Sequence, residues 1–155
     1  MKVLKIQHRS FEVSQVFDGT EISFEDWQAA SFLPSANSTL VLPNSALLQG
    51  LEADFSVFDT IILEFPSFKD GRAYSQARRL REQFGFKGEI RARGDFGRDQ
   101  ILFMLRAGIS AFEAEDENVV AFEAALREFS LFYQTCADAA VPVWHLRAHR
   151  AVAAA

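Results

Sequence analysis

The sequence predicts a single-domain α/β protein in which four strand-helix units form a parallel sheet, open or curled into a partial barrel, with a small N-terminal β-hairpin. From residue 39 onward, short apolar runs alternate with segments of helical period, which is the pattern of repeated strand-helix units. The 155 residues, 49% of them hydrophobic, suffice for one substantial core but not for two comfortable domains. We expect a β element and a short helix over 1–37, the strand-helix units over 38–135, and a tail over 141–155.

The N-terminal part carries a turn signal and a helix start. A strand over 11–17 and another around residues 21–22 flank Asp18-Gly19, a dipeptide that favours a tight hairpin turn. Residues 23–26, Ser-Phe-Glu-Asp, resemble a capping box with Asp in place of Glu. We therefore expect a short helix that contains Trp27.

The first two strand-helix units follow this element. A short apolar strand over 39–42 precedes Asn44, a favourable N-cap residue for a helix. That helix is expected to bury Leu47, Leu48 and Leu51. The second strand, over 60–65, is nearly all apolar, as strands covered on both faces are. The helix after it runs from about residue 71 to residue 84, and its core stripe is Ala73, Ala77, Leu80 and Phe84.

The third and fourth units complete the predicted sheet. The third strand is expected over 89–93, and Asp95 would cap the helix that follows. That helix turns Ile101, Leu102 and Leu105 inward and ends at Gly108. The fourth strand is expected over 109–112. Asp116 then caps the longest helix, whose core stripe is Val119, Phe122, Leu126, Phe129 and Tyr133.

Composition limits the partners and cofactors. The formal net charge of −5 and the 16 Phe residues argue against a nucleic-acid partner. The single cysteine, Cys136, excludes an intrachain disulfide and a thiolate cluster that the chain forms alone. His145 and His149 have helical i, i+4 spacing, but a solvated tail is favoured over a metal role. With no nucleotide motif, no signal peptide and no apolar run of membrane length, we expect a cytoplasmic protein with no cofactor and no membrane partner.

Charge is concentrated in one part of the chain. Residues 67–106 contain ten Lys or Arg and five Asp or Glu, although the whole chain is acidic. The densest clusters, 64–72 and 91–99, follow predicted strands. Ligands of parallel sheets bind at the carboxyl ends of strands, so both clusters are expected at the mouth of the sheet.

Arg91 and Arg93 alternate with apolar residues, so both guanidinium groups should leave one face of a buried strand. A charge there is costly unless it is paired or holds an anion. One interpretation is that these two residues, with Arg72, bind an oxyanion beside the helix start after Asp95. The other is a salt-bridge network that fixes loops, with Glu64, Asp70, Asp95 and Asp99 as the carboxylates. Both stay open on the sequence alone.

Two further groups of polar residues are candidates. Glu64 lies near the end of an apolar strand, where burial would suit it to general acid-base catalysis, and an ion pair to a nearby Arg is the alternative. Tyr74, Arg78 and Arg81 share one face of the predicted helix, with Ser75 beside them. A solvated face is the favoured interpretation of that set.

The stretch from Phe65 to Ser75, Phe-Pro-Ser-Phe-Lys-Asp-Gly-Arg-Ala-Tyr-Ser, and the motifs after it up to Phe112 closely resemble the bacterial family called domain of unknown function 934. Where many members have a Cys before Gly108, this chain has Ala107, which argues against an essential thiol at that position. An aliphatic pair of many members is replaced by Phe96-Gly97. The motif positions that carry over are Lys69, Asp70, Gly71, Arg72, Tyr74, Ser75, Arg78, Arg91, Gly94, Asp95, Asp99 and Gln100.

The resemblance implies a link to sulfur assimilation, because genes of this family commonly lie beside those for assimilatory sulfite reductase, and members are often labelled probable oxidoreductases. We expect an accessory protein that binds a small anion (sulfite, sulfate or phosphate), a sulfite reductase surface, or both. One alternative is a small-molecule enzyme of the partial-barrel kind, with Glu64 as acid-base residue and the arginines as substrate clamp. Another is a structural module, which an apolar groove or a large homodimer surface would favour. Whether the protein is an enzyme, and whether it forms a homo-oligomer, stays open.

Overall fold

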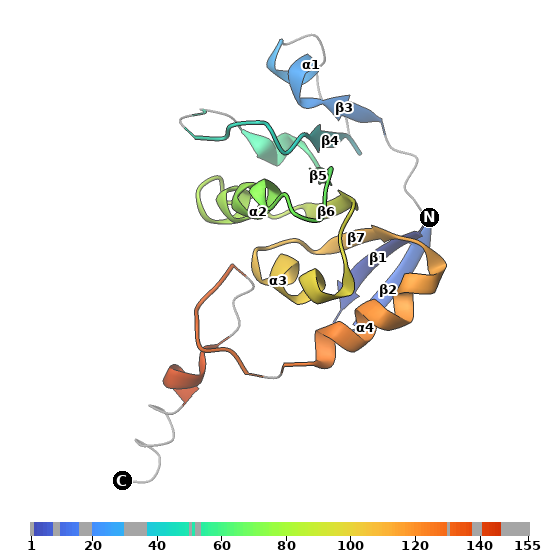
Figure 1. Ribbon diagram of the computed structural model, residues 1–155. Helices are drawn as coiled ribbons and strands as arrows, with labels where there is room; N and C mark the ends of the chain where they lie inside the picture. Colours follow the sequence, from blue (N-terminus) through green and yellow to red (C-terminus); the bar gives the residue numbers. More distant parts are fainter. Residues whose placement is uncertain are drawn as a thin grey trace.

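Seven strands form one mixed sheet in the computed structural model, which describes residues 2–7, 10–15, 20–29, 37–49, 51, 54–129, 131–137 and 141–146 (Figure 1). The sheet order is β2-β1-β7-β6-β5-β4-β3. The strands are β1 (Lys2–Gln7), β2 (Ser10–Gln15), β3 (Glu21–Ser23), β4 (Thr39–Leu42), β5 (Thr60–Phe65), β6 (Glu89–Gly94) and β7 (Ala111–Ala114).

The sheet is mostly parallel, as predicted. Strands β3 to β7 run parallel to one another, and β5 pairs with β6 over its whole length, from Thr60 opposite Glu89 to Phe65 opposite Gly94. Only β1 is antiparallel, both to β7 and to β2. The alternation of apolar runs and helical segments therefore predicted the class of the fold correctly.

The N-terminal hairpin is present, but it is formed by different strands from those expected. It joins β1 to β2, with Gln7 opposite Ser10. Strand β3 lies at the opposite edge of the sheet, beside β4. The expected pairing of residues 11–17 with residues 21–22 is therefore wrong, because β2 and β3 find their partners in β1 and β4. The Asp18-Gly19 dipeptide lies outside the described residues.

The helices are α1 (Phe24–Gln28), α2 (Arg72–Glu82), α3 (Ile101–Arg106) and α4 (Val119–Arg127), with a helical turn at 143–146 and short 3₁₀ turns at Phe55–Val57, Arg98–Gln100 and Asp116–Asn118. Parallel strands β3 to β7 follow one another in sheet order, so right-handed connections place α1, α2 and α3 on one face. Helix α4 follows β7 and contacts α3 and β2. The core lies between that face and the helices. It includes Leu40, Leu63, Ile90 and Phe112 from strands and Phe24, Ala77, Leu80, Met104 and Phe122 from helices.

Local sequence signals predicted two helices correctly. Ser23 caps α1: its hydroxyl accepts from the backbone N–H of Asp26 (3.1 Å) and donates to the Asp26 carboxylate (2.7 Å). Helix α2 covers most of the predicted range, and its stripe residues Ala73, Ala77 and Leu80 are fully buried. Gly85 ends this segment at a φ of +63°, a conformation that glycine adopts without strain.

The helix predicted after Asn44 is absent from the described residues 43–49, which form turns. The reason is a tertiary contact. The Gln76 amide of α2 donates to the carbonyls of Pro43 and Ala46, at 2.9 Å each, and these hydrogen bonds stabilise the non-helical backbone of this loop. Leu48 is buried as expected, but Leu47 is exposed.

The last unit also departs from the prediction. Strand β7 begins two residues later than expected, and α4 ends at Arg127 and is shorter than α2. Phe129 and Tyr133 are therefore exposed rather than part of the core stripe. Asp116 lies in a 3₁₀ turn, and Asn118 precedes α4 without a side-chain cap.

The face of the sheet that lacks helices is strongly concave. Arg93 of β6 contacts Glu21 of β3, although three strand spacings of about 4.8 Å separate these strands along the sheet. Only residues 16–20 join β2 to β3, and a segment of that length spans at most roughly 20 Å, whereas a flat sheet of seven strands is about 29 Å wide. The two edges must therefore approach each other, which makes the sheet a partial barrel with its helices outside.

No helix among the described residues combines the length and the apolar character needed to cross a membrane.

Candidate functional site

The loops at the carboxyl ends of β5 and β6 are tied together by backbone and side-chain hydrogen bonds. The backbone N–H of Asp95 donates to the Phe65 carbonyl (2.7 Å), and the Phe68 N–H donates to the Asp95 carboxylate (3.0 Å). The Gln100 amide donates to the Phe68 carbonyl (3.0 Å). Asp95 thus joins two loops instead of capping a helix, which corrects the prediction.

Gly94 makes this close approach possible. Its φ is +119°, and a Cβ atom there would lie 2.2 Å from the Phe65 carbonyl oxygen. Only glycine fits this position without moving the backbone of β5. This motif position therefore has a structural explanation.

Asp70 organises the start of α2. Its carboxylate accepts from Nε and Nη2 of Arg72, at 3.0 and 2.6 Å, and from the Asn44 side chain (2.8 Å). The hydrogen bonds with Arg72 lower the pKa of Asp70 to about 2. Arg72 is thereby held to its own neighbour, and the loop after β4 is joined to α2.

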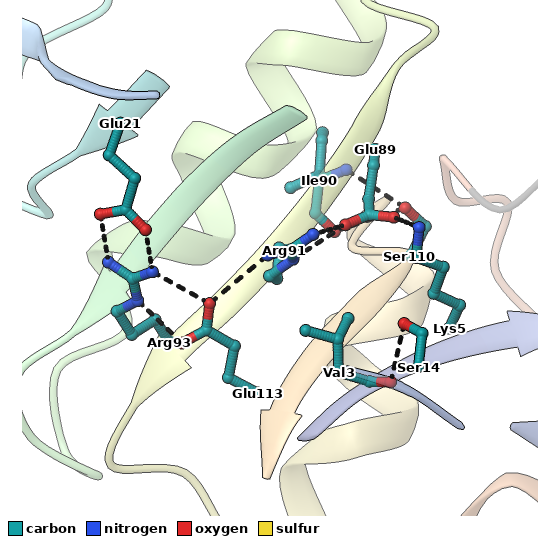
Figure 2. Close-up of polar contacts among 10 residues, drawn as sticks. All are labelled: Val3, Lys5, Ser14, Glu21, Glu89, Ile90, Arg91, Arg93, Ser110 and Glu113. Carbon is teal, nitrogen blue, oxygen red and sulfur yellow. Dashed lines mark hydrogen bonds and ion pairs between the residues drawn. The ribbon is translucent and has the colours of Figure 1, made fainter. Parts of the chain in front are cut away.

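Arg91 lies on the concave face and is only 4% exposed. Its Nε donates to Glu89 on the same strand (2.8 Å), and its Nη1 is 3.7 Å from Glu113 of β7 (Figure 2). Glu89 also receives Lys5 of β1, at 2.7 Å. A buried guanidinium is thus paired on two sides.

Arg93 extends this network toward the mouth of the partial barrel. Its Nε donates to Glu113 (2.8 Å) and its Nη1 donates to Glu21 (3.0 Å), so that Figure 2 shows a continuous chain of contacts from β3 to β1. Hydrogen bonds with Glu21 and Glu113 raise the pKa of Arg93, and the bond with Arg93 lowers the pKa of Glu21. We call the whole set the barrel network. It consists of Lys5, Arg91, Arg93, Glu21, Glu89 and Glu113.

The barrel network balances three cations with three carboxylates, but they are not the predicted ones. Glu64, Asp70, Asp95 and Asp99 form no ion pair with Arg91 or Arg93. The actual partners lie on the same concave face as the arginines, on β3, β6 and β7. Glu113 was not predicted as a partner of the arginines because the strand was expected to end at residue 112. The missing signal was side-chain alternation along the strand. Ala111 lies opposite Arg91, so Glu113, two residues later, leaves the same face of the sheet.

Glu64 lies on this concave face, opposite Arg93 in the register of β5 and β6, and is half-buried. Within the part of the chain that the structure describes, its carboxylate forms no hydrogen bond or ion pair. An acid-base role for Glu64 stays a prediction.

A pocket of about 260 Å³ opens at the carboxyl ends of β6 and β7. Arg93, Gly94, Glu113 and Asn118 line it, with Phe96 and Phe122 as apolar wall. Of the predicted site residues, only Arg93 and Gly94 reach this pocket. Its one cation already contacts two carboxylates.

The remaining predicted site residues are dispersed. Lys69 and Asp99 are exposed, and Arg78 pairs with Glu82 on the surface of α2 (2.8 Å). Arg81 instead donates to three backbone carbonyls, those of Phe86, Gly88 and Gly108. Tyr74 packs edge-on against Phe65, and burial raises the pKa of its phenol to about 12. Ser75 lines a different pocket.

Metal ligands are not clustered in the described part of the chain: no group of three His, Cys, Asp or Glu residues there is placed to hold an ion. His145 and His149 have i, i+4 spacing in the sequence, where a solvated tail was favoured over a metal role; His149 lies outside the described residues.

An apolar groove of about 350 Å³ lies between α3 and the segment after α4. We call it the aromatic groove; it is lined by Leu102, Phe103, Arg106, Phe129, Phe132, Tyr133 and Gln134. The Arg106 guanidinium lies 3.9 Å from the Phe132 ring centroid and donates to the Gln134 carbonyl (2.6 Å), which holds this segment on α3. The sequence analysis missed the groove because it assigned Phe129 and Tyr133 to a buried stripe.

Comparison with known families agrees with the motif between Phe65 and Phe112. A family model of bacterial proteins of unknown function, DUF934, matches residues 39–144. The chain belongs to this family. The matched span of the DUF934 protein runs from β4 through the aromatic groove and includes Arg91, Arg93 and Glu113 of the barrel network. A search of curated proteins gives no match.

Proposed function

We propose that this DUF934 protein is an accessory protein of sulfite reduction that acts by binding a partner protein, with sulfite reductase as that partner and the aromatic groove as the contact surface. The observation that carries the proposal is the exposure of large apolar side chains in the groove. Phe103 is 63% exposed, Phe129 53% and Tyr133 72%. Contiguous exposed apolar surface of this kind marks interaction sites on proteins that are otherwise well packed.

The composition of the groove suits a protein partner. Phe, Tyr and Arg are enriched at protein interfaces, where aromatic anchors supply most of the binding energy. Further exposed apolar side chains continue along the same C-terminal segment, namely Leu131, Val141, Trp144 and Leu146. Sulfite reductase is proposed as the partner because of the gene context that the family resemblance implies.

The barrel network favours a protein-binding function over the binding of an anion at the mouth of the partial barrel. An oxyanion at Arg91 or Arg93 would have to displace Glu89, Glu113 or Glu21, each of which already forms a direct ion pair. The charges of the network cancel, so it offers no net attraction for an anion. This arrangement favours a structural role for the two arginines.

The test is direct binding of the purified full-length protein to purified sulfite reductase. We expect Phe103→Ser and Phe129→Ser each to weaken binding by about tenfold or more, the effect of losing an aromatic anchor. Val120→Ser is the matched control, because Val120 is an exposed apolar residue on α4 that does not line the groove. It should bind as the wild type does.

Three outcomes would contradict the proposal. These are an absence of binding by the wild type, equal binding by all variants, and self-association of the free protein that Phe103→Ser abolishes. The last would identify a second copy of the chain as the occupant of the groove.

A further inference from the structure

A separate pocket lies between α2 and the loop after β4, away from both the aromatic groove and the mouth pocket. Its volume is about 180 Å³, and we call it the α2 pocket. Pockets for drug-sized ligands range from about 300 to 1,000 Å³, so this one suits a small ion. Arg72, Ser75, Gln76 and Arg79 line it from the helix, and residues 44–49 form the opposite wall.

Gln76, one of the residues that line this pocket, carries an unsatisfied acceptor. The side chain is 5% exposed, and its Nε2 donates to two carbonyls, those of Pro43 and Ala46. Because both neighbours of the nitrogen are acceptors, the orientation of the amide is fixed and Oε1 must be an acceptor. This buried oxygen has no hydrogen-bond partner. Such a group costs stability until a donor reaches it.

The charge of the α2 pocket is positive. Arg79 is half-buried and forms no ion pair within the described part of the chain. Arg72 is held by Asp70, and among the described residues that line the pocket there is no carboxylate. The exposed Ser75 hydroxyl adds a further donor. An anion would therefore find a cation here that the protein has not already neutralised.

We infer that the α2 pocket binds a small oxyanion that retains a proton, such as hydrogenphosphate, and discriminates against sulfate. The unpaired Arg79 requires negative charge on the ligand, and the unpaired Gln76 Oε1 requires a donor on the same ligand. Hydrogenphosphate has both, whereas sulfate at neutral pH has only acceptors. A site that offers a buried acceptor rejects an analogue without the matching hydroxyl. Since Oε1 is shielded from solvent, binding includes a small movement of the loop at 44–49.

The experiment is calorimetric titration of the full-length protein with inorganic phosphate and, separately, with sulfate. At slightly alkaline pH both are divalent tetrahedral ions, and they differ mainly in one proton. We expect phosphate to bind, and sulfate to bind at least about tenfold more weakly, which corresponds to the penalty for an unpaired buried acceptor.

Two adjacent arginines give a matched pair of variants. Arg79→Gln should weaken phosphate binding by about tenfold or more, the effect of losing a charge-assisted hydrogen bond. Arg78→Gln removes the same charge one residue away, where the side chain contacts Glu82 and does not line the pocket. It should bind phosphate as the wild type does.

Gln76→Met should remove the preference for phosphate over sulfate, with the melting temperature as a check of folding. If that variant does not fold, the comparison of Arg79→Gln with Arg78→Gln decides. Equal affinity for both ions, equal binding by the two arginine variants, or no phosphate binding by the wild type would overturn the inference; in the last case an ordered water satisfies Gln76.

Discussion

Strand β6 and helix α2 both carry arginines, and Arg91 of β6 and Arg79 of α2 lie in opposite surroundings. Arg91 of β6 is buried and contacts Glu89 and Glu113, whereas Arg79 of α2 has no carboxylate partner within the described residues. The density of arginine in the sequence is similar in both. The number of carboxylates within reach therefore decides which arginine stabilises the fold and which is free to bind.

The shape of the sheet explains this difference. On a concave face, side chains from β3, β6, β7 and β1 converge, so Glu21 can reach Arg93 across the partial barrel. On the outer surface of a helix, neighbours lie only three or four residues away along the chain. Arg78 pairs with Glu82 at that spacing. Glu82 is also three residues after Arg79, but its carboxylate contacts Arg78, and residue 83, four positions after Arg79, is a glutamine.

The largest effect should come from Arg91→Ala. It leaves two carboxylates without their buried partner, and breaking such a pair costs about 3 to 5 kcal/mol. Arg79→Ala, on the partly exposed face of α2, should change the free energy of unfolding by less than about 0.5 kcal/mol. Urea denaturation of both variants measures the contrast. Similar small losses would show that the barrel network is not structural.

Gly94→Ala tests whether the backbone at the end of β6 leaves room for a side chain. The new Cβ would collide with the Phe65 carbonyl at a positive φ, so we expect a loss of about 2 kcal/mol or more. Gly71→Ala, before α2, is the control, because its φ is −88° and the nearest atom is 3.8 Å from the new Cβ. Thermal denaturation should show little change for that variant, and an equal loss in both would refute the steric explanation.

Tyr74 should make the stability of the protein depend on pH under alkaline conditions. Burial, and to a smaller extent Asp99, raises its pKa from 10.0 to about 12, so the unfolded phenol ionises before the folded one. The stability that Tyr74 contributes should therefore be lost as the pH rises from about 10 to 12. Denaturation midpoints across this range should fall less steeply for Tyr74→Phe. Parallel curves for the two proteins would show that the phenol is not shielded.

The smallest expected effect concerns Asp70 under acidic conditions. Hydrogen bonds with Arg72 lower its pKa from 3.8 to about 2, so its contribution is complete above pH 3.8 and is lost as the pH falls toward 2. Asp70→Asn should lack this component of acid destabilisation. Because the pair is exposed, the difference should be small and should shrink with added salt. A salt-independent difference would point to a buried role for Asp70.

Local signals were sufficient for much of the fold. Alternating strand and helix patterns predicted the parallel strands, Ser23 and Asp26 predicted the start of α1, and the stripe of Ala73, Ala77 and Leu80 predicted the buried face of α2. Predictions failed where a distant contact determined the local structure. Gln76 holds residues 43–49 in turns, and α4 ends early enough to leave Phe129 and Tyr133 exposed.

The sequence alone determined the α/β class, the family and the fact that Arg91 and Arg93 leave one face of a buried strand, because side-chain alternation and helical period act over a few residues. Only the tertiary structure decided what those arginines contact. Their partners Glu21 and Glu113 lie 72 and 20 residues from Arg93 in the chain, and the curvature of the sheet brings them together. The same folding leaves Arg79 without a carboxylate, since ion pairing depends on distances of a few ångströms that residue spacing does not specify.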